Sequence, residues 1–423
     1  MFAKIIKSDS KSITVKVEAE ITIPTGKGML EVENFIQSTV NKVGLDLTEC
    51  AFLQFDTDGT PIAIDGKKYT SKGQIPKAYQ TPYGEINVSR HVYQSNQGGN
   101  TYCPLDHDAR IITGSTPKLA KMVSSKYSCS SAREVHKDLN ENHGRYLSMS
   151  YIQDISGSVS DLISEKKTWN YHVDVPQDSV STAGISLDGT CMLLSGDGYR
   201  QAMVGSISLY DSSGERLYTG YTAHPPEYGK KQFYKSFGDE IKRIRKLYPD
   251  SVYVGVADGA ADNWTFLQPH VTEEIIDFFH ASEYLSKCAK AAFRQAEKAK
   301  AWFDNLCHVL KHQEGGVKTV IEELEKLLGK RLKESKIKEI QSSITYFCNH
   351  QHQMEYYRYT KENLPIGSGV IEAACKVIIK QRLCNSGMKW TDNGAKTVLT
   401  LRCFNKTDGM WEQFWNKVNK YGK

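Results

Sequence analysis

Hydrophobic and polar residues alternate along the first strand that the sequence predicts. Over residues 13–23, apolar side chains occupy every second position, which is the period of a half-buried β-strand. A helix is predicted over residues 29–44, a hairpin around Asp58-Gly59 and a further strand over residues 84–95. Residues 1–103 are therefore predicted to form a small α+β region.

The pattern becomes helical over residues 104–180. One helix is expected from about Ser130, a turn at Asn142-His143-Gly144 and a second helix capped near Ser148. Two helices joined by a short turn have the layout of a helix-turn-helix, which suggests a DNA-binding segment. The second helix is not basic, however, so an ordinary pair of packed helices explains the pattern as well.

A different pattern runs over residues 181–281. Three short apolar runs between residues 183 and 224 are separated by turns, and this spacing favours an antiparallel meander. An amphipathic helix, a near-continuous apolar strand at 251–260, a helix at 262–272 and a strand at 273–281 follow. The order β-β-β-α-β-α-β predicts an α/β fold, a mixed sheet flanked by helices, within a chain that is α+β overall.

The remainder of the chain is predicted to be helical. Residues 282–362 have a single break at Gly315-Gly316, and three more helices are expected in residues 363–423. This arrangement describes a sheet domain with a large helical insertion, residues 282–362, followed by a segment that completes the core.

Composition adds one feature, an uneven charge. Residues 1–281 contain 29 Lys and Arg against 34 Asp and Glu (29 − 34 = −5), and residues 282–423 contain 25 against 15 (25 − 15 = +10). This split suggests a polyanionic partner for the C-terminal part, although a solvated helical surface is the commoner cause. No apolar run approaches the roughly 18 residues of a membrane span, so no membrane partner is expected. The 10 irregularly spaced cysteines favour a reducing cytoplasm.

Three acids occur at positions that invite a chemical explanation. Asp188 lies inside an apolar strand and Asp258 ends another, but each precedes a glycine, so a turn explains either one alone. Glu372 is the single acid of an apolar helix that begins near Ser368. The helix dipole and an ion pair with Lys376 at i+4 would account for it. Together, the three fit a ribonuclease-H-like site, where converging carboxylates require divalent cations between them.

Four stretches resemble the DDE transposases of bacterial insertion sequences, most nearly the ISKra type. They are ISLDGT (185–190), VADGAADNW (256–264), IIDFFHASEYL (275–285) and PIGSGVIEAACKVIIKQRLCNSGMKW (365–390). The segments QTPYGEINVSRHVY and CPLD near residues 80–106 also fit that family. The resemblance implies a ribonuclease-H-like catalytic domain in which Asp188, Asp258 and Glu372 are catalytic and bind two Mg²⁺ or Mn²⁺ ions.

The resemblance also implies roles for other residues. His280 lies where related Mutator-like enzymes have the histidine of a Cys-x-x-His motif, so it is a candidate to orient a phosphate or a metal ligand. A histidine satisfied by hydrogen bonds at a strand end explains it equally well. The residues expected to contact DNA are Lys376, Lys380, Arg382, Lys389, Trp390, Trp264 and Arg402. Trp264 is explained as well by a place in the core, and Arg402 by a buried ion pair.

The sequence thus predicts a cytoplasmic bacterial transposase, associated with the nucleoid when bound to DNA. It is expected to bind double-stranded DNA at transposon ends and at the target, to cleave strands with water and to join the 3′-OH ends to the target. By resemblance, it acts as a homo-dimer or higher homo-oligomer. The alternatives are a ribonuclease-H-like nuclease without strand transfer and a domesticated DNA-binding protein that has lost catalysis.

Overall fold

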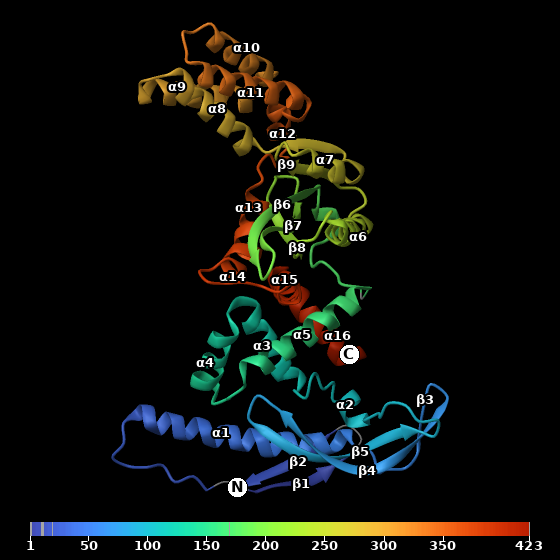
Figure 1. Cartoon of the computed structure of the whole chain (residues 1–423). Helices are drawn as coiled ribbons and strands as arrows, with labels where there is room; N and C mark the ends of the chain where they lie inside the picture. The colour runs from blue at the N-terminus through green and yellow to red at the C-terminus, as the bar shows by residue number, and fades with distance from the viewer. Residues whose placement is uncertain (1, 10–11, 19, 169, 423) are drawn as a thin grey trace. The chain divides into compact units, whose positions relative to one another are not determined.

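The computed structural model describes residues 2–9, 12–18, 20–168 and 170–422. It consists of two compact units, and most of their helices and strands are labelled in Figure 1. Unit 1 comprises Met1–Tyr171 and Met410–Lys423, and unit 2 comprises His172–Gly409. No helix within the described ranges combines the length and the apolar character needed to cross a membrane.

Unit 1 begins with two small antiparallel sheets and a long helix. Strands β1 (Phe2–Ser8) and β2 (Ile13–Glu18) form one sheet, and β3 (Ile62–Ile64), β4 (Lys67–Gln80) and β5 (Glu85–Ser95) form the other. Helix α1 (Met29–Phe52) is longer than predicted and leads into the short helix η1 (Leu53–Phe55). The hairpin predicted around Asp58-Gly59 is wrong, because the β3–β4 turn lies at Asp65-Gly66, where φ is 49° and 74°.

Helices make up the rest of unit 1. They are α2 (Pro104–Asp108), α3 (Pro117–Cys129), α4 (Ala132–His143), α5 (Met149–Glu165), η2 (Lys166–Thr168) and α16 (Met410–Tyr421). The predicted pair α4–α5 is confirmed as helices: Ser131 and Glu134 form a capping box, Gly144 ends α4 with a φ of 60°, and Ser148 caps α5. Helix α16 belongs to unit 1, so the prediction that all of residues 363–423 complete the sheet domain is wrong for this last helix.

Unit 2 is built on a five-stranded mixed sheet. Its strands are β6 (Thr182–Leu194), β7 (Gly198–Tyr210), β8 (Arg216–His224), β9 (Val252–Ala257) and β10 (Glu273–Ile276), in the spatial order β10-β9-β6-β7-β8. Strands β6, β7 and β8 form an antiparallel meander, whereas β9 runs parallel to β6 and β10 parallel to β9. This order and these directions are those of the ribonuclease-H-like fold, so the predicted fold class is confirmed.

Helices cover both faces of this sheet (Figure 1). Helices α6 (Lys231–Leu247) and α7 (Ala261–Leu267) lie on one face, where the ring of Phe237 packs directly over Gly205 of β7. The other face carries α13 (Gly369–Ala374), the π-helical segment η6 (Cys375–Lys380), α14 (Gln381–Leu383) and α15 (Asp392–Lys406). Two short helices, η3 (Gln177–Ser179) and η4 (Gln268–His270), lie in the connections.

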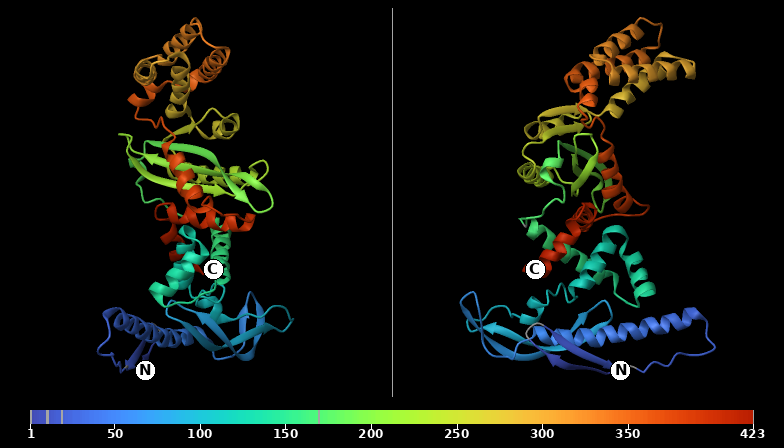
Figure 2. Two further views of the ribbon diagram at one scale, coloured as in Figure 1. Left: turned by 60° about the vertical axis from the view of Figure 1, so that its left-hand side comes forward. Right: turned by 180° about the vertical axis from the view of Figure 1, so that it is seen from behind.

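The helical insertion packs as a bundle, yellow to orange in Figure 2. It contains α8 (Phe278–Ala292), α9 (Ala296–His312), α10 (Gly316–Leu328), α11 (Glu334–His350), η5 (Gln351–Gln353) and α12 (Tyr356–Lys361). The predicted break at Gly315-Gly316 is confirmed, although the bundle has further breaks. The strand predicted at 273–281 is too long, because β10 ends at Ile276 and Asp277 caps α8. The buried core is continuous from the sheet into this bundle.

Candidate active site

Asp188 lies within β6, and Asp258 directly follows β9, the strand that runs parallel to it. The pairing of β6 with β9 reaches Ile185 and Gly255, and each aspartate lies three residues further along its chain (188 − 185 = 3 and 258 − 255 = 3). Neighbouring strands are about 4.8 Å apart. Continued for three residues beyond the last pair, this register brings Asp188 in the middle of β6 level with Asp258, just past the end of β9. In α/β proteins, ligand-binding groups gather where parallel strands such as β9 end.

The loop after β9 holds Asp258 firmly. Its Oδ1 accepts hydrogen bonds from the backbone N–H of Ala260 and from Nδ2 of Asn263, each at 3.1 Å. The indole N–H of Trp264 donates to the backbone oxygen of Asp258 at 2.8 Å. Because Trp264 is only 5% exposed, it supports this loop from the core and is not free to stack on a DNA base. The core alternative for Trp264 is therefore the correct one.

Glu372 lies on α13, on the face of the sheet toward which Asp188 points. One helical turn after Glu372, the thiol of Cys375 donates to Oδ2 of Asp188 at 3.4 Å. Burial, and then the negative charge of Asp188, raise the pKa of Cys375 to about 12, so the thiol keeps its proton at neutral pH. This contact brings the helix of Glu372 against the central strand at the position of Asp188.

The ion pair that would explain Glu372 as an ordinary surface acid is not formed. Within the described chain, no contact of 4.0 Å or less joins Glu372 to Lys376, and both side chains are exposed. Glu372 Oε1 instead lies 3.1 Å from the hydroxyl of Ser368. The π-helical segment η6 begins three residues later, and such segments in α-helices often mark functional sites.

Carboxylate oxygens are the donors that Mg²⁺ and Mn²⁺ prefer, so the chemistry of these three acids fits either ion. Among the residues that the structure describes, however, no three His, Cys, Asp or Glu side chains are close enough to form a complete metal cage. The β6–β9 register points Asp188 and Asp258 toward the same end of these parallel strands, and the Cys375 contact places the helix of Glu372 beside Asp188.

Asp277 is a further acid in the same row, and sequence reasoning did not assign it to the site. Ile276 pairs with Ala257, so Asp277 follows β10 directly beside Asp258. Asp277 is 3% exposed, and its carboxylate accepts four hydrogen bonds. The donors are the backbone N–H groups of Phe279, His280 and Ser368 and the hydroxyl of Ser368. An aspartate just before a helix is the usual N-cap signal, which could have revealed this role.

His280 lies in the first turn of α8, so the expectation that it lies at a strand end is wrong. Its ring faces the rings of Tyr284 and Tyr346, which stack on each other with centroids 3.9 Å apart. Tyr346 also packs against Gly259, where a Cβ would come within 2.7 Å of its ring. Burial raises the pKa of Tyr346, as do the charges of nearby groups that include Asp258. The helical insertion thus packs against the Asp258 loop through an aromatic cluster that consists of His280, Tyr284 and Tyr346.

The predicted DNA-contacting residues fall into two groups. Lys376, Lys380 and Lys389 are exposed, as phosphate contact requires. Arg382 and Arg402 are 2% and 4% exposed, and the Arg382 guanidinium lies 5.0 Å from the centre of the Trp390 ring. The Arg402 Nε donates to the backbone oxygen of Val377. These two arginines stabilise the helical layer in this structure, and the prediction that they contact DNA is corrected accordingly.

Trp390 is also held by the protein itself. Its indole N–H donates to the backbone oxygen of Leu383 at 2.9 Å, and its backbone exchanges hydrogen bonds with Leu193 and Ser195 at the end of β6. With Arg382 on its ring, Trp390 fastens the end of the π-helical region to the central strand. Its part-buried ring has this structural role, and base stacking by Trp390 stays a prediction.

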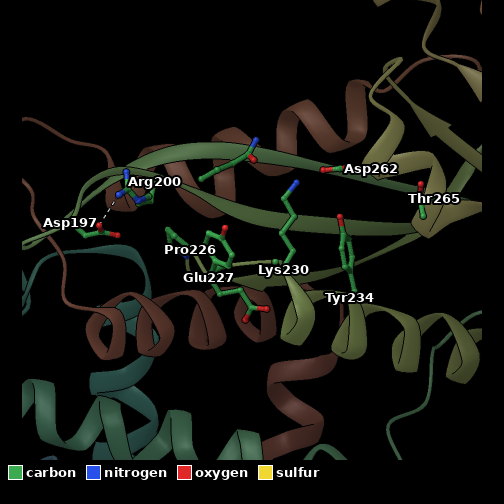
Figure 3. Close-up of a pocket in the computed structure, with 11 residues that line it drawn as sticks. Asp197, Arg200, Pro226, Glu227, Lys230, Tyr234, Asp262 and Thr265 are labelled. Atoms are coloured by element: carbon green, nitrogen blue, oxygen red, sulfur yellow. Dashed lines mark hydrogen bonds and ion pairs between the residues drawn. The ribbon is translucent and has the colours of Figure 1, made fainter.

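A cavity of about 600 Å³ lies on the opposite face of the sheet, between the β6–β7 turn and the start of α6 (Figure 3). Its charges nearly cancel: Arg200 pairs with Asp197 at 2.8 Å, and Lys230 faces a wall that includes Glu227 and Asp262. Because the cavity lies across the sheet from the Cys375–Asp188 contact, it is separate from the row of acids.

No family model and no curated protein matches the chain. The solved structures that are similar include a transposase complex and an Argonaute. The Drosophila P element transposase strand transfer complex is 7% identical, with a TM-score of 0.26, over 73% of this chain and 81% of that chain. Argonaute from A. aeolicus is 14% identical, with a TM-score of 0.17, over 38% of this chain and 23% of that chain. The chain thus spans less than a quarter of the Argonaute chain, and the fold assignment rests on strand order and register rather than on either likeness.

Proposed function

We propose that this chain is a metal-dependent enzyme that cleaves DNA strands and joins their 3′-OH ends to other DNA, a DDE transposase. The observation that carries the proposal is the shared register of Asp188 and Asp258, with the helix of Glu372 placed over Asp188 by Cys375. Turn chemistry explains each aspartate by itself, but it does not require the two to be adjacent, nor an acid-bearing helix to cover them.

Each acid has a definite part in this proposal. Asp188 and Asp258 hold Mg²⁺ or Mn²⁺ at the sheet edge, and Glu372 closes the site from α13. When bound, two such ions activate a water or a 3′-OH and stabilise the oxygen that leaves phosphorus. The exposed Lys376 and Lys380 follow Glu372 along the same helical segment, where they contact the phosphates beside the scissile bond.

The proposal of a transposase goes further than that of a nuclease, because it adds strand joining. This addition rests on the resemblance to the ISKra type. It implies that the same acids perform cleavage and joining, that the partners are transposon ends and target DNA, and that two or more copies assemble on DNA. The alternative nuclease uses the same residues and differs only in lacking the joining step. The cytoplasmic, nucleoid-associated location belongs to the same proposal.

The test uses the full chain and a supercoiled plasmid that carries the genomic DNA on both sides of its own reading frame. Mg²⁺ or Mn²⁺ should support strand cleavage, whereas Ca²⁺ should permit DNA binding with little cleavage, and EDTA should stop it. A second assay supplies the mapped ends with free 3′-OH groups and a separate target plasmid. Joined products support a transposase, and cleavage without joining supports the nuclease. Cleavage that persists in EDTA overturns both.

A further inference from the structure

The carboxylate of Asp277 is fully engaged within the protein. Oδ1 accepts from the backbone N–H groups of Phe279 and Ser368, both at 3.1 Å, and Oδ2 accepts from the N–H of His280 at 3.3 Å and the hydroxyl of Ser368 at 2.7 Å. A carboxylate offers about four acceptor positions, so these four donors use them all. Asp277 therefore lies in the row of acids without an oxygen to spare for a metal ion.

Ser368 stands at the N-cap position of α13 but does not cap that helix. A serine at this position usually accepts a hydrogen bond from the helix backbone, which is worth about 1 kcal/mol. The Ser368 side chain makes no such bond, and its backbone has a φ of −82° and a ψ of 13° rather than extended values. Its hydroxyl points to Asp277 and Glu372 instead, so the helix gives up its usual cap in favour of these two acids.

The Ser368 hydroxyl has one proton and two acids within reach. It lies 2.7 Å from Asp277 Oδ2 and 3.1 Å from Glu372 Oε1. A hydroxyl donates one hydrogen bond at a time, and the shorter contact identifies Asp277 as the principal acceptor. The longer contact makes Glu372 Oε1 the second acceptor of the same hydroxyl, and Oε2 of Glu372 takes no part in this contact. This contact orients the Glu372 carboxylate and leaves its second oxygen available to a cation.

The loop that carries Ser368 is tied to the start of α8 at two further points. The backbone N–H of Phe278 donates to the oxygen of Ile366 at 2.9 Å. The ring of Phe279 lies over Gly367, where a Cβ would come within 3.0 Å of it. These links, with the Asp277 bonds to Ser368, join the start of α8 to the residues that begin the Glu372 helix.

We propose that Asp277 and Ser368 are positioning residues of the metal site: Asp277 holds Ser368, and the Ser368 hydroxyl orients the Glu372 carboxylate toward the bound ion. This inference rests on the proposed function, because it takes Glu372 to be a metal ligand. Groups that orient metal ligands contribute about 10- to 100-fold to metal affinity. Neither residue touches the reacting atoms.

The experiment measures Mn²⁺ affinity of the full chain by calorimetric titration, together with the melting temperature and the DNA-cleavage rate as a function of Mn²⁺ concentration. Ser368→Ala should weaken Mn²⁺ binding by about 10-fold or more. Cleavage should recover within a few-fold at saturating Mn²⁺. Ser368→Thr keeps the hydroxyl and should restore most of the affinity. Ser282→Ala is the matched control, because Ser282 is a half-buried serine of α8 whose hydroxyl donates to a backbone oxygen.

The outcomes separate this inference from the proposed function. If Glu372→Gln abolishes cleavage while Ser368→Ala binds Mn²⁺ as tightly as the parent, the positioning role is overturned and the proposed function stands. The same conclusion follows if Ser368→Thr folds like the parent but loses as much affinity as Ser368→Ala. If Glu372→Gln binds Mn²⁺ and cleaves DNA like the parent, the proposed function itself fails.

Discussion

The thiol of Cys375 lies 3.4 Å from Oδ2 of Asp188, and this contact links the Glu372 helix to the central strand of the sheet. Glu372 and Asp188 are 184 residues apart in the chain (372 − 188 = 184), with the whole helical insertion between them. Cys375 is one turn beyond Glu372, so its contact fixes both the depth and the rotation of the helix. The position of Glu372 relative to Asp188 is thus set by side-chain packing, and substitutions can test whether both acids act in cleavage.

Glu372→Gln should leave the fold intact and remove DNA cleavage. Because Glu372 is exposed and has no ion pair with Lys376 among the described residues, the substitution should cost no more than about 1 kcal/mol of helix-dipole stabilisation. Cleavage should fall by about 100-fold or more, as expected for a group that acts in the transition state. Cleavage rate and melting temperature are measured on the same preparation.

Asp188→Asn and Asp258→Asn should lose cleavage to a similar extent, and pairing any two of these substitutions should add little, since the three acids act as a unit. Glu339→Gln, at an exposed acid of α11, provides the control and should cleave like the parent. A Glu372→Gln protein that cuts DNA at near-parent rate would show that Glu372 is an ordinary surface acid.

Charge reversal at Lys376, Lys380 and Lys389 should weaken DNA binding for all sequences alike. Each lost phosphate contact should lower the slope of log affinity against log salt by about 1. The matched control reverses Lys235, Lys242 and Lys246, which are exposed on α6 over the other face of the sheet. Affinity is measured by titration at several salt concentrations. If both triple variants lose affinity equally, only net charge matters, and the face of α13 has no special part in binding.

Trp390→Ala should destabilise unit 2 rather than remove a DNA contact. The ring shields the buried Arg382 guanidinium, a desolvated cation–π contact worth about 2 kcal/mol, and the part-buried indole adds packing, so a total loss of about 2–4 kcal/mol is expected. Trp390→Phe keeps a ring over Arg382 and should lose less. Chemical denaturation measures both variants. A Trp390→Ala protein with parent stability but much weaker DNA binding would support the base-stacking role that the sequence suggested.

His270 should make the protein less stable in mild acid. Burial, followed by the charges of Arg245 and Lys242, holds the pKa of His270 below its usual 6.5. Between the lowered folded value and 6.5, the unfolded chain binds more protons, so stability rises with pH. The contribution is complete above pH 6.5 and is lost as the pH falls through the folded pKa. His270→Gln should therefore show a smaller drop in melting temperature from pH 7.5 to pH 5, and an unchanged drop would refute this role.

Local signals in the sequence were enough to predict many of the elements. Ser148 and Gly144 mark helix ends through interactions with their immediate neighbours, so both were predicted and found, and the helix expected from about Ser130 begins after its cap at Ser131. Helix α6 was predicted as an amphipathic helix, and its apolar residues Phe233, Phe237 and Ile241 are buried. The strand-helix order of unit 2 also follows from local periodicity, and with it the fold class.

Pairing between distant segments was decided only by the tertiary structure. Asp58 does form a local turn, accepting a hydrogen bond from the N–H of Thr60 at 2.9 Å, but the hairpin is made at Asp65-Gly66. Turn chemistry acts over a few residues, whereas strand pairing depends on which segments share a core. The burial of Arg382 under Trp390 is likewise a matter of packing, because a basic residue has the same sequence signature on a surface and beneath a ring.

The candidate site shows the same division. Asp188, Asp258 and Glu372 were chosen from the sequence, since an acid in an apolar run stands out locally. That Asp188 and Asp258 share a register, that Cys375 joins the Glu372 helix to Asp188, and that Asp277 reaches Ser368 depend on contacts across 70 to 187 residues of chain (258 − 188 = 70; 375 − 188 = 187). The sequence by itself determined which side chains are present and the elements that carry them. Which of these side chains come close together was decided by the burial of the sheet between its two helical layers. That packing sets the register of the strands and the rotation of the Glu372 helix.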